Sequence, residues 1–209
     1  MPPGLRLLTY DANRPKGEAL LRSAWSVGAR LYRGARRVDA HFGARTWKEA
    51  LAWLTSHRTS EPIAEVQHWS HGNWGRVALG DSVLDRTSLA PGSDLRASLD
   101  ALRDRLAPDA LVWFRTCDTF GARAGHDFAM ALSDDLRVRV AGHTYTIHAL
   151  QSGLHGLLPG NPPHWPLDEG LLEGTPDAPR RSRTSSARAP NTLTFADGRV
   201  PEEWFRADR

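Results

Sequence analysis

IAEVQHWSHG, residues 63–72, and ALVWFRTC, residues 110–117, are two segments that each carry a potentially reactive side chain at or near their end. Short apolar runs of this kind predict buried strands. His71 lies just past the first predicted strand, and Cys117 lies just past the second. We therefore predict that an imidazole and a thiol meet across the end of one sheet, as a base and a nucleophile.

The segments that flank these two runs predict an alternation of strands and helices. Leu20, Ala24, Val27 and Leu31 are spaced as on one face of a helix that packs on a sheet, and Leu21, Trp25 and Tyr32 widen this apolar stripe. Thr46 and Glu49 form a capping-box pattern at the start of another helix. The sequence predicts further strands at 5–10, 38–42 and 138–141, helices at 16–33, 46–57, 93–106 and 121–132, and a small hairpin within 75–84 that turns at Gly80-Asp81.

This alternation predicts an α/β fold with a mostly parallel sheet. In such sheets, binding sites lie beyond the carboxyl ends of the strands, near the point where the strand order reverses. His71 and Cys117 both follow predicted strand ends. The predicted site therefore lies at the carboxyl edge of the sheet.

The chain changes character after residue 152. Glycine and proline are frequent between residues 153 and 166, and residues 175–190 are polar and rich in arginine. We therefore predict an α/β domain over residues 1–152 and an irregular C-terminal extension over residues 153–209, with a flexible linker at 175–190. Residues 202–205 form a small amphipathic end that could dock back on the domain or fill a groove in it. The extension is compatible with a propeptide, an autoinhibitory strap or a docking arm.

Composition limits the classes of function. The chain has 209 residues, a formal net charge of +3 and a single cysteine. The excess of positive charge is concentrated in residues 175–190, which favours a solvated basic tail over a nucleic-acid-binding face. One cysteine permits no intramolecular disulfide, and neither a secretory leader nor a membrane-spanning run is evident, so we expect a cytoplasmic protein that contacts neither nucleic acid nor membrane. The oligomeric state is not determined by the sequence.

Taken together, these motifs resemble the caspase-like fold of cysteine peptidases (clan CD), and most of all the bacterial DUF4347 domain. The shared pattern is an apolar strand, Ser-His-Gly, a glycine-rich turn with Leu-Gly, a helix, an apolar strand that ends in a cysteine, and then a glycine, a helix and a strand. It covers roughly residues 5–148. The resemblance implies a three-layer αβα sandwich and a thiol-dependent endopeptidase that acts on a peptide or protein substrate without a cofactor.

The resemblance also implies roles for single residues. His71 matches the catalytic histidine, Cys117 the nucleophile and Gly72 the glycine after the histidine, and the 46-residue gap from His71 to Cys117 is close to the ~50 residues of caspases. Backbone N–H groups of Cys117 and Gly72 are expected to face the oxyanion. Trp74 and Asp118 are expected to contact substrate. Thr116 and Asp118 flank the thiol where caspases have alanine and arginine, so aspartate specificity is not implied.

Several alternatives stay open at this stage. A lone cysteine after an apolar strand is most often a small buried residue, and Asp118 fits a helix N-cap better than a substrate contact. His68 and His71, like His143 and His148, are too poorly spaced on a strand to chelate a metal easily, and no metal or cofactor is expected. No serine-hydrolase elbow or phosphate-binding glycine motif is present. The alternative function is a catalytically silent caspase-like module that binds a peptide or protein partner.

Overall fold

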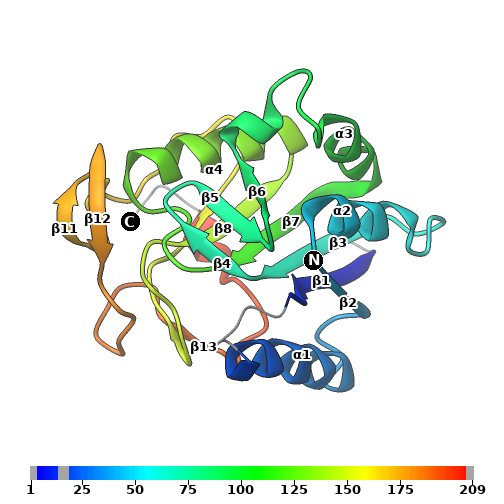
Figure 1. The fold of residues 1–209 in the computed structure, drawn as a ribbon, viewed down its shortest axis with the longest axis horizontal. Helices are drawn as coiled ribbons and strands as arrows, with labels where there is room; N and C mark the ends of the chain where they lie inside the picture. The colour runs from blue at the N-terminus through cyan, green and yellow to red at the C-terminus, as the bar shows by residue number, and fades with distance from the viewer. Residues whose placement is uncertain (1–3, 14–18, 206–209) are drawn as a thin grey trace.

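A six-stranded sheet forms the centre of the molecule, for which the computed structural model describes residues 4–13 and 19–205. The strands are ordered β10-β8-β7-β3-β1-β2. Every neighbouring pair is parallel except β8 and β10, so the sheet is mixed but mostly parallel (Figure 1). The strands are β1 (Leu5–Asp11), β2 (Ala40–Ala44), β3 (Ile63–Trp69), β7 (Leu106–Arg115), β8 (Arg139–His143) and β10 (Leu154–Leu157). The predicted α/β class with a mostly parallel sheet is confirmed.

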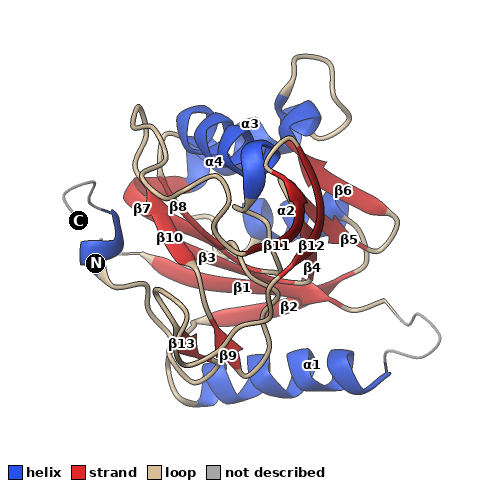
Figure 2. Ribbon diagram, turned by 90° about the vertical axis from the view of Figure 1, so that its left-hand side faces the viewer, coloured by secondary structure: helices blue, strands red, loops and turns tan. Residues whose placement is uncertain are grey.

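Helices cover both faces of the sheet. α1 (Ala19–Gly34) lies on one face, whereas α2 (Trp47–Ser56), α3 (Arg96–Arg105) and α4 (Ala122–Leu136) lie on the other (Figure 2). Parallel strands are joined by right-handed crossovers. The chain runs outward from β1 to β2, then crosses back over β1 to β3 and continues to β7 and β8. This reversal places α1 opposite the other helices, and it makes the gap between β1 and β3 the switch point of the sheet.

The two faces of the sheet bury different clusters of side chains. The larger cluster joins the apolar side chains of α2, α3 and α4 to Leu7, Val66 and Phe114 of the sheet. On the α1 face, one cluster surrounds Trp69, and a second surrounds Trp113. Central strands are thus covered on both faces, as their continuous apolar runs predict.

The helix α1 packs through only one side of the predicted apolar stripe. Val27 is 49% exposed and Leu31 is 65% exposed, whereas Ala29 and Tyr32 are buried. The side chain of Leu20 lies outside the described residues. At Gly28, an added Cβ would lie 2.6 Å from the Phe195 ring and 3.0 Å from the Trp69 ring. Close packing at this glycine turns Val27 and Leu31 away from the sheet, so the prediction is wrong for these two residues, whereas Tyr32 is buried as predicted.

The helix α2 begins at the predicted cap. Thr46 accepts a hydrogen bond from the Glu49 N–H at 3.2 Å. The Glu49 carboxylate, however, accepts from the Arg45 N–H at 2.8 Å, one residue before the position that a capping box uses. One face of the helix is buried, and it consists of Trp47, Ala50, Leu51 and Leu54.

A small antiparallel sheet follows β3 and contains the predicted hairpin. It consists of β4 (His71–Asn73), β5 (Arg76–Leu79) and β6 (Ser82–Asp85), in that order. Gly80 has a positive φ of 59° between β5 and β6, and Asp81 lies in the same turn. The short 3-10 helix Arg86–Leu89 then leads toward α3.

The segment after residue 152 is more ordered than the sequence predicted. The strand β10 completes the central sheet, and β11 (Leu171–Thr175) pairs with β12 (Ala178–Ser182) in place of part of the expected linker. The short strand β13 (Leu193–Thr194) pairs with β9 (Leu150–Gln151). The expectation of irregular structure after residue 152 is wrong for these segments, because main-chain pairing needs no apolar pattern and is not prevented by nearby proline and glycine.

The amphipathic end docks on the sheet, one of the two outcomes expected for it. It forms the 3-10 helix Glu202–Phe205, and Phe205 is 5% exposed. At Gly156 of β10, an added Cβ would lie 2.4 Å from the Phe205 ring, so the glycine makes room for the phenyl group. We call residues 193–201, which comprise β13 and its connection to this helix, the C-terminal strap.

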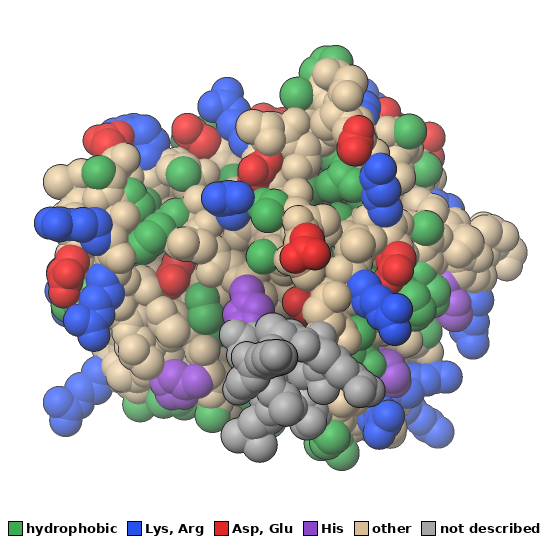
Figure 3. Space-filling view, in the orientation of Figure 1, with side chains coloured by type: hydrophobic (Ala, Val, Ile, Leu, Met, Phe, Trp, Pro, Cys, Tyr) green, Lys and Arg blue, Asp and Glu red, His purple; other side chains and the backbone are tan. Residues whose placement is uncertain are grey.

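Charge is distributed without a single dominant patch on the face that Figure 3 shows. Basic and acidic side chains are interspersed there (Figure 3). Among the described residues, no helix is both long and apolar enough to cross a membrane.

Candidate functional site

His71 and Cys117 line the same pocket at the carboxyl edge of the sheet. β3 and β7 are paired in parallel with Trp69 opposite Arg115, and each reactive residue follows its strand end by two positions. The pocket has a volume of about 390 Å³, in the range of small-ligand sites. It is lined by Ala24, Trp25, Trp69, Ser70, His71, Arg115, Cys117, Ile147, His148, Ala149, Gln151 and Phe195. We call it the histidine–cysteine pocket.

Gly72 allows the two strand ends to approach each other. A Cβ at this position would lie 2.3 Å from the Thr119 Oγ1 atom, 2.5 Å from the Cys117 carbonyl oxygen and 2.8 Å from the Thr116 Cβ. Any side chain would therefore push the cysteine loop away from the histidine. The Gly75 N–H donates to the Thr119 carbonyl at 2.9 Å and fixes the same two loops to each other.

The Cys117 thiol is mostly buried, and its surroundings favour the protonated form. The Ile147 N–H donates to the sulfur at 3.4 Å, and the sulfur lies 3.9 Å from the Ile147 carbonyl oxygen. Burial, and to a smaller extent the nearby Asp118 carboxylate, raise the thiol pKa to about 11, although the Ile147 N–H contact acts in the opposite direction. In this arrangement the resting thiol is not a preformed thiolate.

Two imidazoles line the pocket, and they differ in their contacts. The His71 ring is half-buried and packs edge-on against Trp25 of α1, with ring centroids 5.3 Å apart. Both ring nitrogens of His148 are engaged by backbone groups, Nε2 with the Ser185 carbonyl at 3.0 Å and Nδ1 with the Leu150 N–H at 3.3 Å. His148 is therefore held as a structural group, and His71 is the imidazole that the sequence pairs with Cys117.

A buried polar chain supports the end of β3. Thr9 Oγ1 hydrogen-bonds His68 Nδ1 at 2.8 Å, and His68 Nε2 hydrogen-bonds Ser70 Oγ at 2.9 Å. Ser70 Oγ in turn donates to the His71 carbonyl at 3.2 Å. Burial lowers the His68 pKa to about 3, so this ring is neutral at physiological pH. Both of its nitrogens are occupied, which leaves none for a metal.

Other histidines also lie in structural surroundings. His143 is fully buried, its Nδ1 lies 3.1 Å from the Ser152 carbonyl oxygen, and burial lowers its pKa to about 3. Within residues 4–13 and 19–205, no group of three or more metal-ligating side chains could hold a metal ion.

Arg115 forms part of the pocket wall and holds the C-terminal strap in place. Its guanidinium donates to Gln151 Oε1 at 2.6 and 2.8 Å and to the Tyr32 hydroxyl. It also donates to strap carbonyls, that of Asp197 at 3.1 Å and that of Phe195 at 3.2 Å. Its carbon Cζ lies 4.5 Å from the Trp113 ring centroid. A buried cation is thus satisfied by carbonyl groups and aromatic faces.

The strap brings an aromatic side chain to the pocket. Phe195 packs on Trp69 and Tyr32, with ring centroids 5.1 and 5.9 Å apart. The Tyr32 hydroxyl donates to the Phe195 carbonyl at 2.6 Å. Sequence reasoning did not identify Trp25, Arg115, His148 or Phe195 as pocket residues. The one signal for Arg115 in the sequence was its place at the end of the apolar run 110–114, directly before Thr116-Cys117.

Trp74 and Asp118, the two expected substrate contacts, are not among the residues that line this pocket. Trp74 has a positive φ of 23° and lies beside Gly121. Asp118 does not cap α4 either, because the cap is Gly121 and no side chain caps this helix. The N-cap interpretation of Asp118 is therefore wrong.

The Asp118 carboxyl group is instead buried beside Cys117. Burial raises its pKa to about 6, although hydrogen bonds from the Ser182 and Thr146 side chains act in the opposite direction. Its Oδ1 atom is buried without a hydrogen-bond partner among the described residues. The backbone at Asp118 is left-handed, with φ of 52°, and a turn follows before α4 begins.

Comparison of the chain with models of known protein families finds no match, and no curated protein sequence matches it.

Proposed function

We propose that this protein is a cysteine-dependent peptidase in which His71 and Cys117 act as base and nucleophile. The observation that carries the proposal is that both side chains line one pocket at the carboxyl ends of β3 and β7. Parallel sheets place their sites at this edge. The pocket contains the two groups that thiol-based acyl transfer requires.

The order of elements supports a caspase-like, three-layer αβα fold. An apolar strand, Ser-His-Gly, a glycine-bearing turn with Leu-Gly, a helix, and a second strand followed by the cysteine occur in the order of the resembled pattern. A glycine at position 121, α4 and β8 then complete it. Helices lie on both faces of the sheet, as a three-layer arrangement requires (Figure 2).

The proposed reaction begins from the protonated thiol. His71 removes the proton from the Cys117 sulfur as the sulfur forms a bond to the peptide carbonyl carbon, and backbone N–H groups of Cys117 and Gly72 stabilise the oxyanion. The carbon–nitrogen bond then breaks, and the His71 imidazolium gives its proton to the leaving amine. Water hydrolyses the thioester and restores the thiol. The raised thiol pKa makes this general-base route preferable to attack by a preformed thiolate.

The aromatic walls of the pocket favour an apolar substrate side chain. Trp25 and Phe195 line the pocket together with Ile147. Trp74 and Asp118 lie outside it, so any contact they make with substrate is at a different subsite.

Mutagenesis of the two pocket imidazoles tests the proposal. Alkylation of Cys117 by iodoacetamide at neutral pH should slow by at least about tenfold in His71→Ala, because general-base assistance contributes roughly 10²–10⁴-fold. His148→Ala is the matched control, since its ring lines the same pocket but is held by backbone groups. Equal alkylation rates in wild type and His71→Ala would overturn the base role. Peptide-library cleavage should disappear in Cys117→Ala.

A silent peptide-binding module is the second candidate, and the buried, hydrogen-bonded thiol favours it. In this case the same pocket holds a peptide side chain without reaction. Cys117→Ala separates the two candidates. Peptide binding that survives this substitution, with no cleavage by wild type, favours the silent module.

A further inference from the structure

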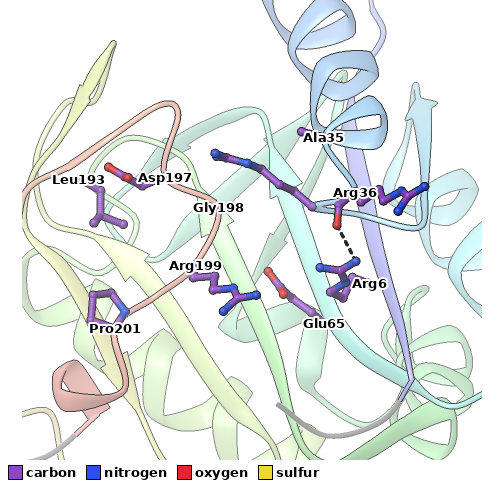
Figure 4. Close-up of a pocket in the computed structure, with 10 residues that line it drawn as sticks. Arg6, Ala35, Arg36, Glu65, Leu193, Asp197, Gly198, Arg199 and Pro201 are labelled. Atoms are coloured by element: carbon purple, nitrogen blue, oxygen red, sulfur yellow. Dashed lines mark hydrogen bonds between the residues drawn. The ribbon is translucent and has the colours of Figure 1, made fainter.

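A second cavity, distinct from the histidine–cysteine pocket, lies between the C-terminal strap and the segment that follows α1. It has a volume of about 470 Å³. Most of the side chains that line it are polar or charged, and arginines from three separate parts of the chain contribute to it. The lining residues are Arg6, Ala35, Arg36, Arg37, Glu65, Leu193, Asp197, Gly198, Arg199 and Pro201. We call it the arginine cavity (Figure 4).

The arginines of this cavity have few carboxylate partners. Arg6 pairs with Asp39 at 3.4 Å and donates to the Arg36 carbonyl at 2.7 Å. Within the described part of the chain, Arg36, Arg37 and Arg199 form no salt bridge. Gathering like charges in this way has an electrostatic cost, which an anionic ligand would offset.

The two acidic residues of the cavity are already engaged by other donors. Asp197 Oδ2 accepts from the Thr194 N–H at 2.7 Å and from the Thr194 hydroxyl at 2.8 Å. Glu65 is 3% exposed, and its Oε1 accepts from Gln67 Nε2 at 2.7 Å. Burial raises the pKa of Glu65, and the nearby charges of Arg6, Arg115 and Arg199 act in the opposite direction.

The guanidinium groups approach the cavity from different directions. Arg6 of β1 and Arg199 of the strap lie on either side of Glu65, whereas the side chain of Arg36 points away from it (Figure 4). Arg37 packs over the Tyr32 ring at 5.3 Å and lies against Gly198, where an added Cβ would be 2.9 Å from the Arg37 Cδ. Its position between Tyr32 and Gly198 restrains the side chain before any ligand arrives.

We propose that the arginine cavity binds a small phosphorylated molecule, held chiefly by Arg6, Arg37 and Arg199. Arginine pairs with oxyanions through its planar fork of donors. A phosphate group presents oxygens in several directions, as these three arginines require, whereas a carboxylate presents two oxygens in one plane. The cavity is large enough for an organic phosphate or an oligophosphate. Binding would connect the strap, through Arg199, to β1 and to the segment after α1.

Calorimetric titration of the full chain with inorganic pyrophosphate tests this site. In about 0.15 M salt, where long-range attraction is screened, we expect saturable binding that weakens by about tenfold or more in Arg199→Gln. Arg180→Gln is the matched control, because this arginine is exposed on β12 outside the cavity. It should leave the affinity within about twofold of wild type. Arg37→Gln, with its fold checked by circular dichroism, should weaken binding as Arg199→Gln does.

Three outcomes would overturn the proposal. These are no binding of pyrophosphate, an equal loss in Arg180→Gln and Arg199→Gln, and binding of citrate as tight as that of pyrophosphate. The last would show that the cavity recognises negative charge without preference for phosphate. Because the measurement is of binding alone, its result is independent of whether Cys117 is catalytic.

Discussion

The histidine–cysteine pocket and the arginine cavity share the C-terminal strap as a wall, yet their chemistry is opposite. Aromatic and aliphatic side chains dominate the first, together with one thiol and two imidazoles. Arginines dominate the second. The strap contributes Phe195 to the first, and Asp197, Gly198 and Arg199 to the second. A short segment can therefore serve two sites of different polarity.

The strap has a different role in each of the two sites. In the histidine–cysteine pocket, the strap adds an apolar wall to a site whose reactive groups come from the sheet edge. In the arginine cavity, the strap supplies one of the binding groups itself. Arg115 donates to the carbonyl groups of Phe195 and Asp197, one residue from each wall, so it fixes the strap for both sites.

Arg115→Ala should have the largest effect, because it releases the wall that the two sites share. The substitution removes a buried guanidinium and leaves Gln151 Oε1 without its two hydrogen bonds from Arg115. We expect a loss of about 3–5 kcal/mol in the free energy of unfolding, measured by urea denaturation. Proteolysis at the strap should also become faster. Arg181→Ala, in an exposed pair with Glu173, should cost less than about 1 kcal/mol.

Gly72→Ala should disturb the histidine–cysteine pocket alone. The new Cβ would meet the Thr119 side chain at 2.3 Å and the Cys117 carbonyl at 2.5 Å, and a backbone atom cannot yield as a flexible side chain can. We expect a destabilisation of about 1–3 kcal/mol and a changed rate of Cys117 alkylation. Gly34→Ala is the control, since no atom lies within 4 Å of the Cβ it would add. Pyrophosphate binding that changed with Gly72→Ala would contradict the separation of the two sites.

Asp118→Asn isolates the electrostatic contribution beside the thiol. The pKa of Asp118 is raised from 3.8 to about 6, so the carboxyl group favours the folded state when protonated. Its contribution is fully present below pH 3.8 and is lost as the pH rises through about 6. Asp118→Asn should therefore stabilise the protein by about 3 kcal/mol at pH 8 and have little effect near pH 4. Removal of the negative charge should also lower the pKa of Cys117.

Thermal denaturation between pH 4 and pH 8 measures the first effect, and the pH dependence of alkylation measures the second. A stability gain that is the same at pH 4 and pH 8 would show that the substitution acts through packing. The raised carboxyl pKa would then not be its cause.

Phe195→Ala should have the smallest effect and should act on the apolar pocket. It removes a ring that packs on Trp69 and lines the pocket with Cys117. We expect alkylation of Cys117 to become a few times faster, roughly a twofold to fivefold change, because burial of the thiol decreases. Phe205→Ala is a useful comparison, since this ring packs on β10 and does not line the pocket. An equal acceleration in both variants would indicate general loosening of the strap.

Much of the central sheet followed from the sequence. The strand β3 occupies the predicted residues, and β7 contains the predicted run, because continuous apolar segments are needed where a strand is covered on both faces. Helical spacing was only partly correct for α1. Tyr32 of the predicted stripe is buried, but Val27 and Leu31 are exposed, and the contact face is set by Gly28, whose importance depends on Phe195 far along the chain.

The sequence by itself determined the α/β class, the strand ends that carry His71 and Cys117, and the glycine between them. These features depend on local periodicity and on residue type, which a chain displays without folding. Only the tertiary structure decided that residues 154–157 complete the sheet, that Arg115 anchors the strap, and that arginines from three chain segments form one cavity. The physical reason is that an arginine has the same chemistry in the sequence whether it becomes buried, as Arg115 does, or lines an open cavity. Its role depends on the residues around it, and folding brings these together from distant parts of the chain.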